Sequence, residues 1–155
     1  MRIILEGCDG VGKTTLANIL AEKYHLDICH CTSHDPADFM FYYQSARKNN
    51  IIWDRHTVGE LIYPKVFNRT QQICTEDARI VINYFRDLGG KIFVLTASDD
   101  VINDRLIARG SEDERILSQQ KAINEAFIRY ADAFCIPIIN TSTMSLNEIF
   151  KLVED

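Results

Sequence analysis

The stretch RIILEGCDGVGKTT, residues 2–15, decides the fold of this chain. It runs from a short apolar segment through a turn with three glycines into a segment, Lys13 to Tyr24, whose apolar residues recur at helical spacing. Gly7 to Thr14 fit the pattern G-x-x-x-x-G-K-[ST], between a predicted strand and a predicted helix as the pattern requires. The backbone N–H groups of such a turn and the positive end of the following helix attract anions. The stretch therefore predicts a site for the phosphates of a nucleoside triphosphate.

The residues of this turn have separate predicted roles. Lys13 is expected to reach the β- and γ-phosphates of ATP, the Thr14 hydroxyl to ligate Mg²⁺ held between them, and Thr15 to add a phosphate contact. The alternative is a turn that only connects strand and helix, but such a match arises by chance in on the order of one per cent of chains of this size. The predicted nucleotide contacts are Asp9, Gly10, Val11, Gly12, Lys13, Thr14 and Thr15.

Strands and helices alternate along the rest of the chain. Short apolar or β-branched runs predict strands over residues 2–6, 27–32, 51–53, 91–96 and 136–139. Helical spacing and capping residues predict helices over residues 13–24, 36–47, 75–88 and 98–109, then up to 133, and from Ser145 onward. This alternation predicts an α/β fold with a five-stranded parallel sheet covered by helices on both faces, as one domain over residues 1–155.

The composition fits a single enzyme domain. Of 155 residues, 46% are hydrophobic, which is enough for a substantial core. Lys and Arg total 17 against 22 Asp and Glu, and the net charge of -5 disfavours nucleic acid and anionic membranes as partners. The five cysteines lack a metal-ligand spacing and are expected to be reduced thiols. No stretch reads as a signal peptide or a membrane span, so a cytoplasmic location is expected.

A second motif, IIWDRHTVGELIY at residues 51–63, places an acid at the end of a predicted strand. In open α/β sheets, ligands bind at the carboxyl ends of the strands. Asp54 is therefore expected to hold Mg²⁺ through water, and Arg55 to face a phosphate. The alternative is a strand-end ion pair, but position and charge together favour the functional interpretation.

A third motif, RLIARGSEDER at residues 105–115, carries three arginines. Arg105 and Arg109 lie four residues apart on one predicted helix face, and Arg115 follows a polar segment. Guanidinium groups stabilise the negative charge of a transferring phosphoryl group, and a segment that closes over it excludes water. The alternative is a solvated helix face paired with the neighbouring acids, which the charge pattern supports about equally well.

The three motifs, in this order and in this strand–helix context, resemble those of thymidylate kinases and the wider family of P-loop nucleotide and nucleoside kinases. The resemblance spans nearly the whole chain and implies a three-layer P-loop NTPase fold. It implies that Asp9 contacts the sugar 3′-hydroxyl of the acceptor, that Asp54 and Arg55 serve the magnesium and the phosphates, and that residues of about 108–117 form an arginine-bearing lid. Relatives are often dimers, so a homodimer is possible here too.

By the same resemblance, the lid must supply the catalytic cation. Gly10 stands where some relatives carry an arginine in the phosphate loop, which makes Arg109 and Arg115 the favoured residues. The residues predicted to be catalytic are Asp9, Lys13, Arg55, Arg105, Arg109 and Arg115.

The chain departs from the family in the region expected to bind the acceptor. The family's Arg-Glu-Pro is His34-Asp35-Pro36 here, so a phosphate-binding arginine is missing. The tyrosine of the Asp-Arg-Tyr motif is His56, and a serine further on is Gly59.

The family's base-stacking aromatic and the arginine one helical turn later map onto Tyr43 and Arg47. Phe39 or Tyr42 are alternative stacking residues, and a purely structural aromatic cluster is the other interpretation. The predicted acceptor contacts are Asp9, Tyr43, Arg47, Arg55 and Tyr63.

Together these features predict an ATP- and Mg²⁺-dependent kinase that phosphorylates a deoxynucleoside monophosphate, with a pyrimidine such as dTMP as the preferred acceptor. A nucleoside, favoured by the missing arginine, is one alternative. A hydroxyl on a modified pyrimidine base, either free or within DNA, is the other alternative and fits the short acceptor region, although the overall acidity counts against DNA. A non-catalytic nucleotide-binding switch is the alternative from a different functional class.

Overall fold

The computed structural model of the chain describes residues 1–32, 35–110 and 114–155, the last range without the side chains of 114–117. Its centre is a parallel sheet of five strands in the order β2-β3-β1-β4-β5. The strands are β1 (Arg2–Glu6), β2 (Asp27–His30), β3 (Ile51–Asp54), β4 (Lys91–Thr96) and β5 (Ile138–Asn140). The chain leaves β1 towards one side of the sheet and later reaches β4 on the other side. The carboxyl end of β1 therefore lies at a topological switch point, where such sheets bind ligands.

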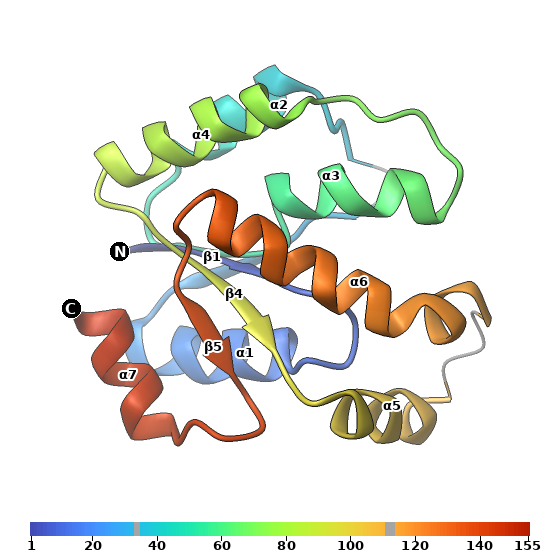
Figure 1. Cartoon of the computed structure of the whole chain (residues 1–155). Helices are drawn as coiled ribbons and strands as arrows, with labels where there is room; N and C mark the ends of the chain where they lie inside the picture. The colour runs from blue at the N-terminus through green and yellow to red at the C-terminus, as the bar shows by residue number, and fades with distance from the viewer. Residues whose placement is uncertain (33–34, 111–113) are drawn as a thin grey trace.

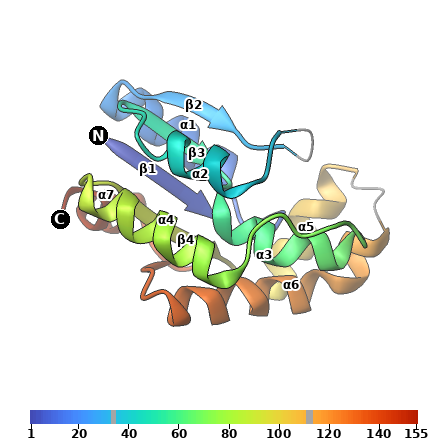
Figure 2. The same cartoon turned by 90° about the horizontal axis from the view of Figure 1, so that it is seen from above.

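Helices cover both faces of the sheet, which gives three layers (Figures 1 and 2). The helices are α1 (Lys13–Tyr24), α2 (Phe39–Ser45), α3 (Thr57–Val66), α4 (Thr75–Asp87), α5 (Asp99–Ala108), α6 (Glu114–Ala133) and α7 (Leu146–Glu154). Figure 1 shows α1 and α7 on one face and α3, α4 and α6 on the other, with α2 over α4. The predicted α/β fold with a five-stranded parallel sheet is confirmed.

The apolar strands form the core because both faces of the sheet are covered. Ile3, Ile4 and Leu5 of β1 are fully buried, and Ile52 and Trp53 of β3 are almost fully buried. A strand buried on both faces has a continuous apolar run rather than an alternating pattern, and β1 and β3 show such runs. The core thus fixes the two central strands from which the loops of the site emerge.

Several strand boundaries in the structure differ from the predicted ones by one or two residues. β2 ends at His30 rather than at residue 32, and β5 covers residues 138–140 rather than 136–139. The capping box at the start of α7 is confirmed, because the Ser145 hydroxyl accepts from the Glu148 N–H and the Glu148 carboxylate accepts from the Ser145 N–H.

Helix α3 was not predicted from the sequence. Every residue from Thr57 to Pro64 is buried, so the helix has no polar face and no apolar periodicity. Gly59 and Pro64 are also weak helix formers. α3 lies between α4 and α6 and begins within the second motif, two residues after Arg55.

In the part of the chain that the structure describes, no helix combines the length and the apolar character needed to cross a bilayer.

Candidate functional site

The glycine-rich loop between β1 and α1 has the backbone geometry of an anion cradle. Gly7, Gly10 and Gly12 have φ angles of 138°, 81° and 90°, which favour glycine. A Cβ atom on Gly7 would lie 2.5 Å from the backbone oxygen of Leu95 on β4, so no side chain fits there. Helix α1 begins at Lys13, and no described side chain caps its first turn. The free N–H groups of that turn are therefore available to an anion.

Lys13 folds back into this loop. Its side chain is buried, and its Nζ donates a hydrogen bond to the backbone oxygen of Cys8 at 2.7 Å. Burial lowers the pKa of Lys13, the charge of Arg55 adds to that effect, and Asp9 and Asp54 oppose it. A phosphate anion would offset the hydration that the buried ammonium has lost.

Asp54, at the end of β3, joins three segments of the site. Its Oδ2 accepts a hydrogen bond from the Thr14 hydroxyl at 2.9 Å and lies 3.0 Å from Nδ1 of His30. The predicted metal ligands Thr14 and Asp54 are thus in direct contact. His30, an exposed residue to which the sequence assigned no role, also lines the cleft. The sheet register explains this, because His30 and Asp54 are cross-strand neighbours at the carboxyl ends of β2 and β3.

Arg55 connects the loop to the neighbouring cavity. Its guanidinium forms an ion pair with the Asp9 carboxylate and lies 5.0 Å from the centre of the Tyr63 ring. Its backbone has a φ of 72°, which is rare for a residue other than glycine. The structure therefore brings together three residues predicted separately from the first two motifs.

A cleft of about 440 Å³ opens at the carboxyl edge of the sheet. The loop residues and Lys13 form one wall, and Asp54 and Arg55 form another. Arg109, which is exposed at the end of α5 and is one of the three predicted lid arginines, also lines this cleft. A guanidinium in this wall suits an anionic ligand.

Arg105 contacts the outer side of the phosphate loop. Its Nη1 donates to the backbone oxygen of Gly10 at 3.2 Å and to the Thr141 hydroxyl at 3.0 Å. A second cavity of about 400 Å³ lies beside it, lined by Gly12 and Arg109 together with apolar residues of α1 and α7. The loop and the two arginines thus separate two cavities. Thr141, which the sequence did not single out, also donates to the backbone oxygen of Val11 at 2.8 Å.

The third lid arginine, Arg115, lies in the first turn of α6, but its side chain is outside the described residues. Of the other two, Arg105 contacts the phosphate loop and Arg109 lines the cavities on either side of it.

Helix α6 touches the loop through two buried polar residues four positions apart. Gln120 donates to the Cys8 sulfur at 2.9 Å and to the backbone oxygen of Asp9 at 3.2 Å. Asn124 accepts from the Thr96 hydroxyl at 3.0 Å. This pair was not predicted from the sequence, although two amides four residues apart on an otherwise apolar helix face were a usable signal.

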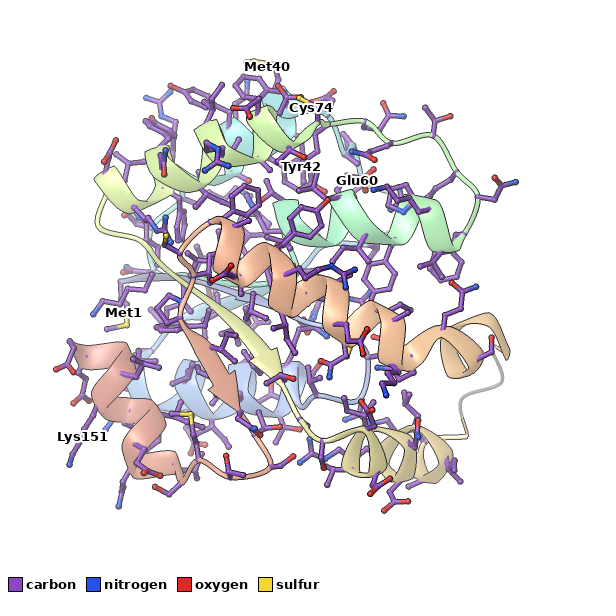
Figure 3. The ribbon with its side chains drawn as sticks, in the orientation of Figure 1. Met1, Met40, Tyr42, Glu60, Cys74 and Lys151 are labelled. Carbon is purple, nitrogen blue, oxygen red and sulfur yellow. The ribbon has the colours of Figure 1, made fainter. Side chains whose placement is uncertain are left out.

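A small cavity of about 80 Å³ lies on the far side of Arg55. Its walls include Tyr42 of α2, His56 before α3, and Gly59 and Tyr63 of α3. Figure 3 shows Tyr42 and Glu60 facing this region from α2 and α3.

Glu60 and Arg69 form a two-pronged ion pair in the wall of this cavity. The Nη2 to Oε2 distance is 2.8 Å and the Nη1 to Oε1 distance is 3.3 Å. Glu60 is buried, and about a third of the Arg69 side chain is exposed. Glu60 was not singled out from the sequence, because its pairing with Arg69 forms only when the segment after α3 folds back.

The predicted acceptor pair Tyr43 and Arg47 is not brought into this region. The Tyr43 ring stacks on Tyr84 of α4 at a centroid distance of 4.3 Å and on Phe39 at 5.6 Å. Arg47 is exposed beyond the end of α2. The helix face that carries Tyr43 packs against α4, so Tyr42 on the adjacent face points towards the cavity instead.

A family model, AAA_18, described as an AAA domain, matches residues 3–126. The curated protein cytidylate kinase 2 of Borreliella afzelii (strain PKo) is 24% identical over 171 residues, which cover 100% of this chain and 95% of the relative.

Two solved structures show the same architecture. The YorR protein from Bacillus subtilis, in complex with phosphorylated GDP, has a TM-score of 0.83 and 25% identity, covering 99% of this chain and 94% of the other. Thymidylate kinase from Candida albicans has a TM-score of 0.63 and 17% identity, and the match covers 98% of this chain and 88% of the other. The last similarity concerns the fold alone.

Proposed function

The chain belongs to the AAA_18 family of P-loop nucleoside and nucleotide kinases, and from that premise we propose that it transfers the γ-phosphoryl group of ATP to a pyrimidine deoxynucleoside monophosphate such as dTMP. One observation carries the proposal. The Thr14 hydroxyl and the Asp54 carboxylate, 40 residues apart in sequence, meet at 2.9 Å at the rim of a cleft that also holds Lys13 and Arg109. A turn with a purely structural role would not require this convergence.

The donor half of the cleft fits a triphosphate with Mg²⁺. Thr14 and Asp54 offer the oxygen ligands that Mg²⁺ prefers. Among the described residues, no group of three or more His, Cys, Asp or Glu side chains forms a protein-only metal site, which fits an ion shared with bound phosphates. Held by these two residues, Mg²⁺ would neutralise charge on the β- and γ-phosphate oxygens.

The protein's own groups would do the remaining work by position and charge. The loop N–H groups and Lys13 bind the phosphates, and Arg109 faces the charge that develops on the transferred group. The second cavity, about 400 Å³ and largely apolar, suits the adenine of the donor, because it lies directly outside the loop and shares Gly12 and Arg109 with the cleft.

The acceptor would enter from the opposite side of Arg55. Asp9, Arg55 and Tyr63 meet there, so a sugar hydroxyl and a phosphate would have a carboxylate and a guanidinium within reach. The choice of a pyrimidine rests on the motif resemblance to thymidylate kinases and on the similarity to a cytidylate kinase. CMP and dCMP are therefore the first competitors to compare with dTMP.

The test is an acceptor panel with γ-labelled ATP. The panel contains dTMP, dCMP, CMP, dAMP, the matching nucleosides and oligonucleotides with and without a hydroxymethylated pyrimidine. We expect label in dTDP at a kcat/KM at least tenfold above that for any nucleoside. Absence of label in every monophosphate would contradict the proposal, and the Lys13→Ala variant serves as the background control.

A nucleoside acceptor is the second candidate, and one observation favours it. Both arginines of the small cavity are already paired, Arg55 with Asp9 and Arg69 with Glu60, so within the described residues neither offers an unpaired charge to an incoming phosphate. Label in nucleosides but not in monophosphates would establish this function.

Two further expectations are tested with the same protein. Binding of ATP without transfer to any acceptor would indicate a nucleotide-dependent switch. The expected homodimer stays a prediction, which light scattering on the purified protein would check.

A further inference from the structure

Glu6, the last residue of β1, is a fully buried carboxyl group with no role in the chemistry described above. It lies one residue before the phosphate loop and on the side of the sheet that carries α3. Burial raises the pKa of Glu6 to about 7, while the N–H groups of Val58 and His56, the charge of Lys13 and the N–H of Gly59 act in the opposite direction. A group that is costly to bury needs a structural reason.

One oxygen of Glu6 caps helix α3. Oε1 accepts hydrogen bonds from the Val58 N–H at 2.7 Å and from the His56 N–H at 3.2 Å. His56 is the N-cap residue of α3, and its own side chain makes no capping bond. A carboxylate from β1 thus replaces the usual local cap and faces the positive end of the helix dipole.

The same contacts fix the corner that carries Arg55. The Arg55 N–H donates to the backbone oxygen of Leu5 at 3.0 Å, and the next N–H, that of His56, donates to Glu6. Leu5 and Glu6 of β1 therefore accept the N–H groups of Arg55 and His56, which precede and follow the left-handed Cα of Arg55. This strained conformation persists only where surrounding contacts determine it.

The second oxygen of Glu6 faces Gly59. Oε2 has no hydrogen-bond partner among the described residues, and a Cβ atom built on Gly59 would lie 3.6 Å from it. A serine hydroxyl at residue 59 would come within hydrogen-bonding range, whereas alanine would add only the methyl group. The two substitutions form a matched pair.

We propose that Glu6 is a positioning residue: its carboxylate fixes the corner between β3 and α3 so that Arg55 holds its guanidinium between Asp9 and the acceptor cavity. The kinetic part of this inference rests on the proposed kinase function, whereas the structural part does not. Glu6 acts through Arg55, because no oxygen of Glu6 reaches the cleft.

The first test compares Glu6→Gln with Glu6→Ala. The glutamine oxygen can accept both N–H groups, and its amide group then occupies the place of Oε2. We expect amide hydrogen exchange at residues 55–58 to be at least tenfold faster in Glu6→Ala than in the wild type, and within threefold of the wild type in Glu6→Gln. Unchanged exchange in Glu6→Ala would overturn the proposal, whether or not the protein transfers phosphate.

The second test separates positioning from a general loss of stability. With each variant assayed below its own melting temperature, Glu6→Ala should lower kcat/KM for the acceptor at least tenfold and change the affinity for a fluorescent ATP analogue less than twofold. An equal loss in Glu6→Gln and Glu6→Ala, or a loss confined to ATP binding, would overturn the proposal. A wild type that phosphorylates no acceptor would refute only the proposed function.

The third test uses the Gly59 pair. An ionised carboxylate accepts the two N–H groups more strongly than a neutral carboxyl or amide oxygen, so kcat/KM for the acceptor should fall by up to about threefold as the pH drops through about 7. Gly59→Ser should move this fall to lower pH, Gly59→Ala should not, and Glu6→Gln should lack it.

Other titrating groups do not distinguish these variants. The groups that interact electrostatically with Glu6 in the described residues are Lys13, Cys31, Tyr42, Arg55 and Tyr63. These residues and the substrate phosphates are common to all three variants and the wild type. An identical acid limb in the wild type and Glu6→Gln would contradict the proposal, and so would equal shifts in Gly59→Ser and Gly59→Ala.

Discussion

The two halves of the cleft are built in different ways. The donor half is centred on one continuous stretch, residues 10–15, whose glycine backbone and N–H groups face the phosphates, and Asp54 and Arg109 complete it. The acceptor half collects side chains from α2, α3 and the loops around them, and its arginines are paired with Asp9 and Glu60. Backbone groups bind the phosphates of any triphosphate, whereas a constellation of side chains distinguishes between ligands. Substitutions in the donor half should therefore affect every acceptor equally, and those in the acceptor half should not.

Lys13→Ala should have the largest effect. Removing this buried ammonium should lower kcat for every acceptor by about 10²- to 10³-fold, because a charged donor to the transferring phosphates is lost. The melting temperature should not fall, since the buried charge also costs hydration free energy. Initial rates with each active acceptor and a thermal melt check both expectations.

Lys151→Ala is the matched control for this variant. Lys151 is exposed on α7, and Figure 3 shows it at the far end of the molecule from α3 and Glu60. Its removal should leave all rates within twofold of the wild type. A Lys13→Ala variant that lost activity with one acceptor only would contradict the separation of the two halves.

The contribution of the Glu60–Arg69 pair to the wall of the acceptor cavity can be tested by measuring the free energy of unfolding. Replacing Glu60 with Ala leaves the Arg69 guanidinium without its two-pronged partner. Breaking a buried ion pair costs about 3–5 kcal/mol, but a third of Arg69 is exposed, so we expect about 1–3 kcal/mol here. Urea unfolding of both single variants and the double variant gives the coupling energy. A coupling near zero would show that the pair does not hold the cavity wall.

The same pair should also influence the choice of acceptor. Glu60→Gln keeps the shape of the side chain but removes the charge opposite Arg69. An unpaired guanidinium favours an anionic ligand. The ratio of kcat/KM for dTMP to that for thymidine should therefore rise severalfold, while the affinity for ATP stays constant. A fall in this ratio would contradict the assignment of this wall to the acceptor.

The sequence predicted the donor half well because its determinants are local. The pattern from Gly7 to Thr14 specifies a turn, a lysine and a helix start within a few residues, and the structure has all three. The end of β3 at Asp54 was also readable from a short apolar run followed by an acid. The contact between Asp54 and His30 was not predicted, nor were the contacts of Gln120 and Thr141 with the loop. His30 becomes a neighbour of Asp54 through the pairing of two strands, and strand register is not a local property of either.

The acceptor half was harder to predict because tertiary packing builds it. Spacing alone placed Tyr43 and Arg47 on one helix face, but which face of α2 meets α4 depends on where α4 lies. α3 escaped detection because a helix that is buried on all sides has no periodic pattern. Glu60 and Arg69 are ordinary surface residues by type, and only the fold buries Glu60.

Two adjacent tyrosines of α2 give a further test of this division. Tyr42 lines the acceptor cavity, whereas Tyr43 stacks on Tyr84. Tyr42→Leu should raise KM for the acceptor about three- to tenfold through lost ring contacts, and Tyr43→Leu should leave it within twofold while still lowering the melting temperature. Steady-state kinetics below both melting temperatures provide the comparison. A larger KM effect in Tyr43→Leu would place the acceptor against α4 instead.

The smallest expected effect is in the pH dependence of stability. Burial lowers the pKa of His56 to about 3, so between pH 3 and about 6.5 the unfolded chain binds the extra proton and stability rises with pH. The pKa of Glu6 is raised to about 7, so between about 4.5 and 7 the folded protein binds the extra proton and stability falls with pH. The two slopes oppose each other between about pH 4.5 and 6.5.

The wild type should therefore have nearly constant stability over this interval, and Glu6→Gln should reveal the slope of His56 alone. In that variant, the free energy of unfolding should rise by about 1 kcal/mol per pH unit from pH 4.5 to 6.5, as one proton per molecule requires. Asp77 and Glu148, whose pKa values are lowered by hydrogen bonds, act at lower pH and are common to both proteins. Urea midpoints at half-unit intervals resolve the difference. If the free energy of unfolding depended on pH in the same way in the wild type and in Glu6→Gln, Glu6 would titrate as an exposed carboxyl does. The corner between β3 and α3 would then not depend on a buried acid.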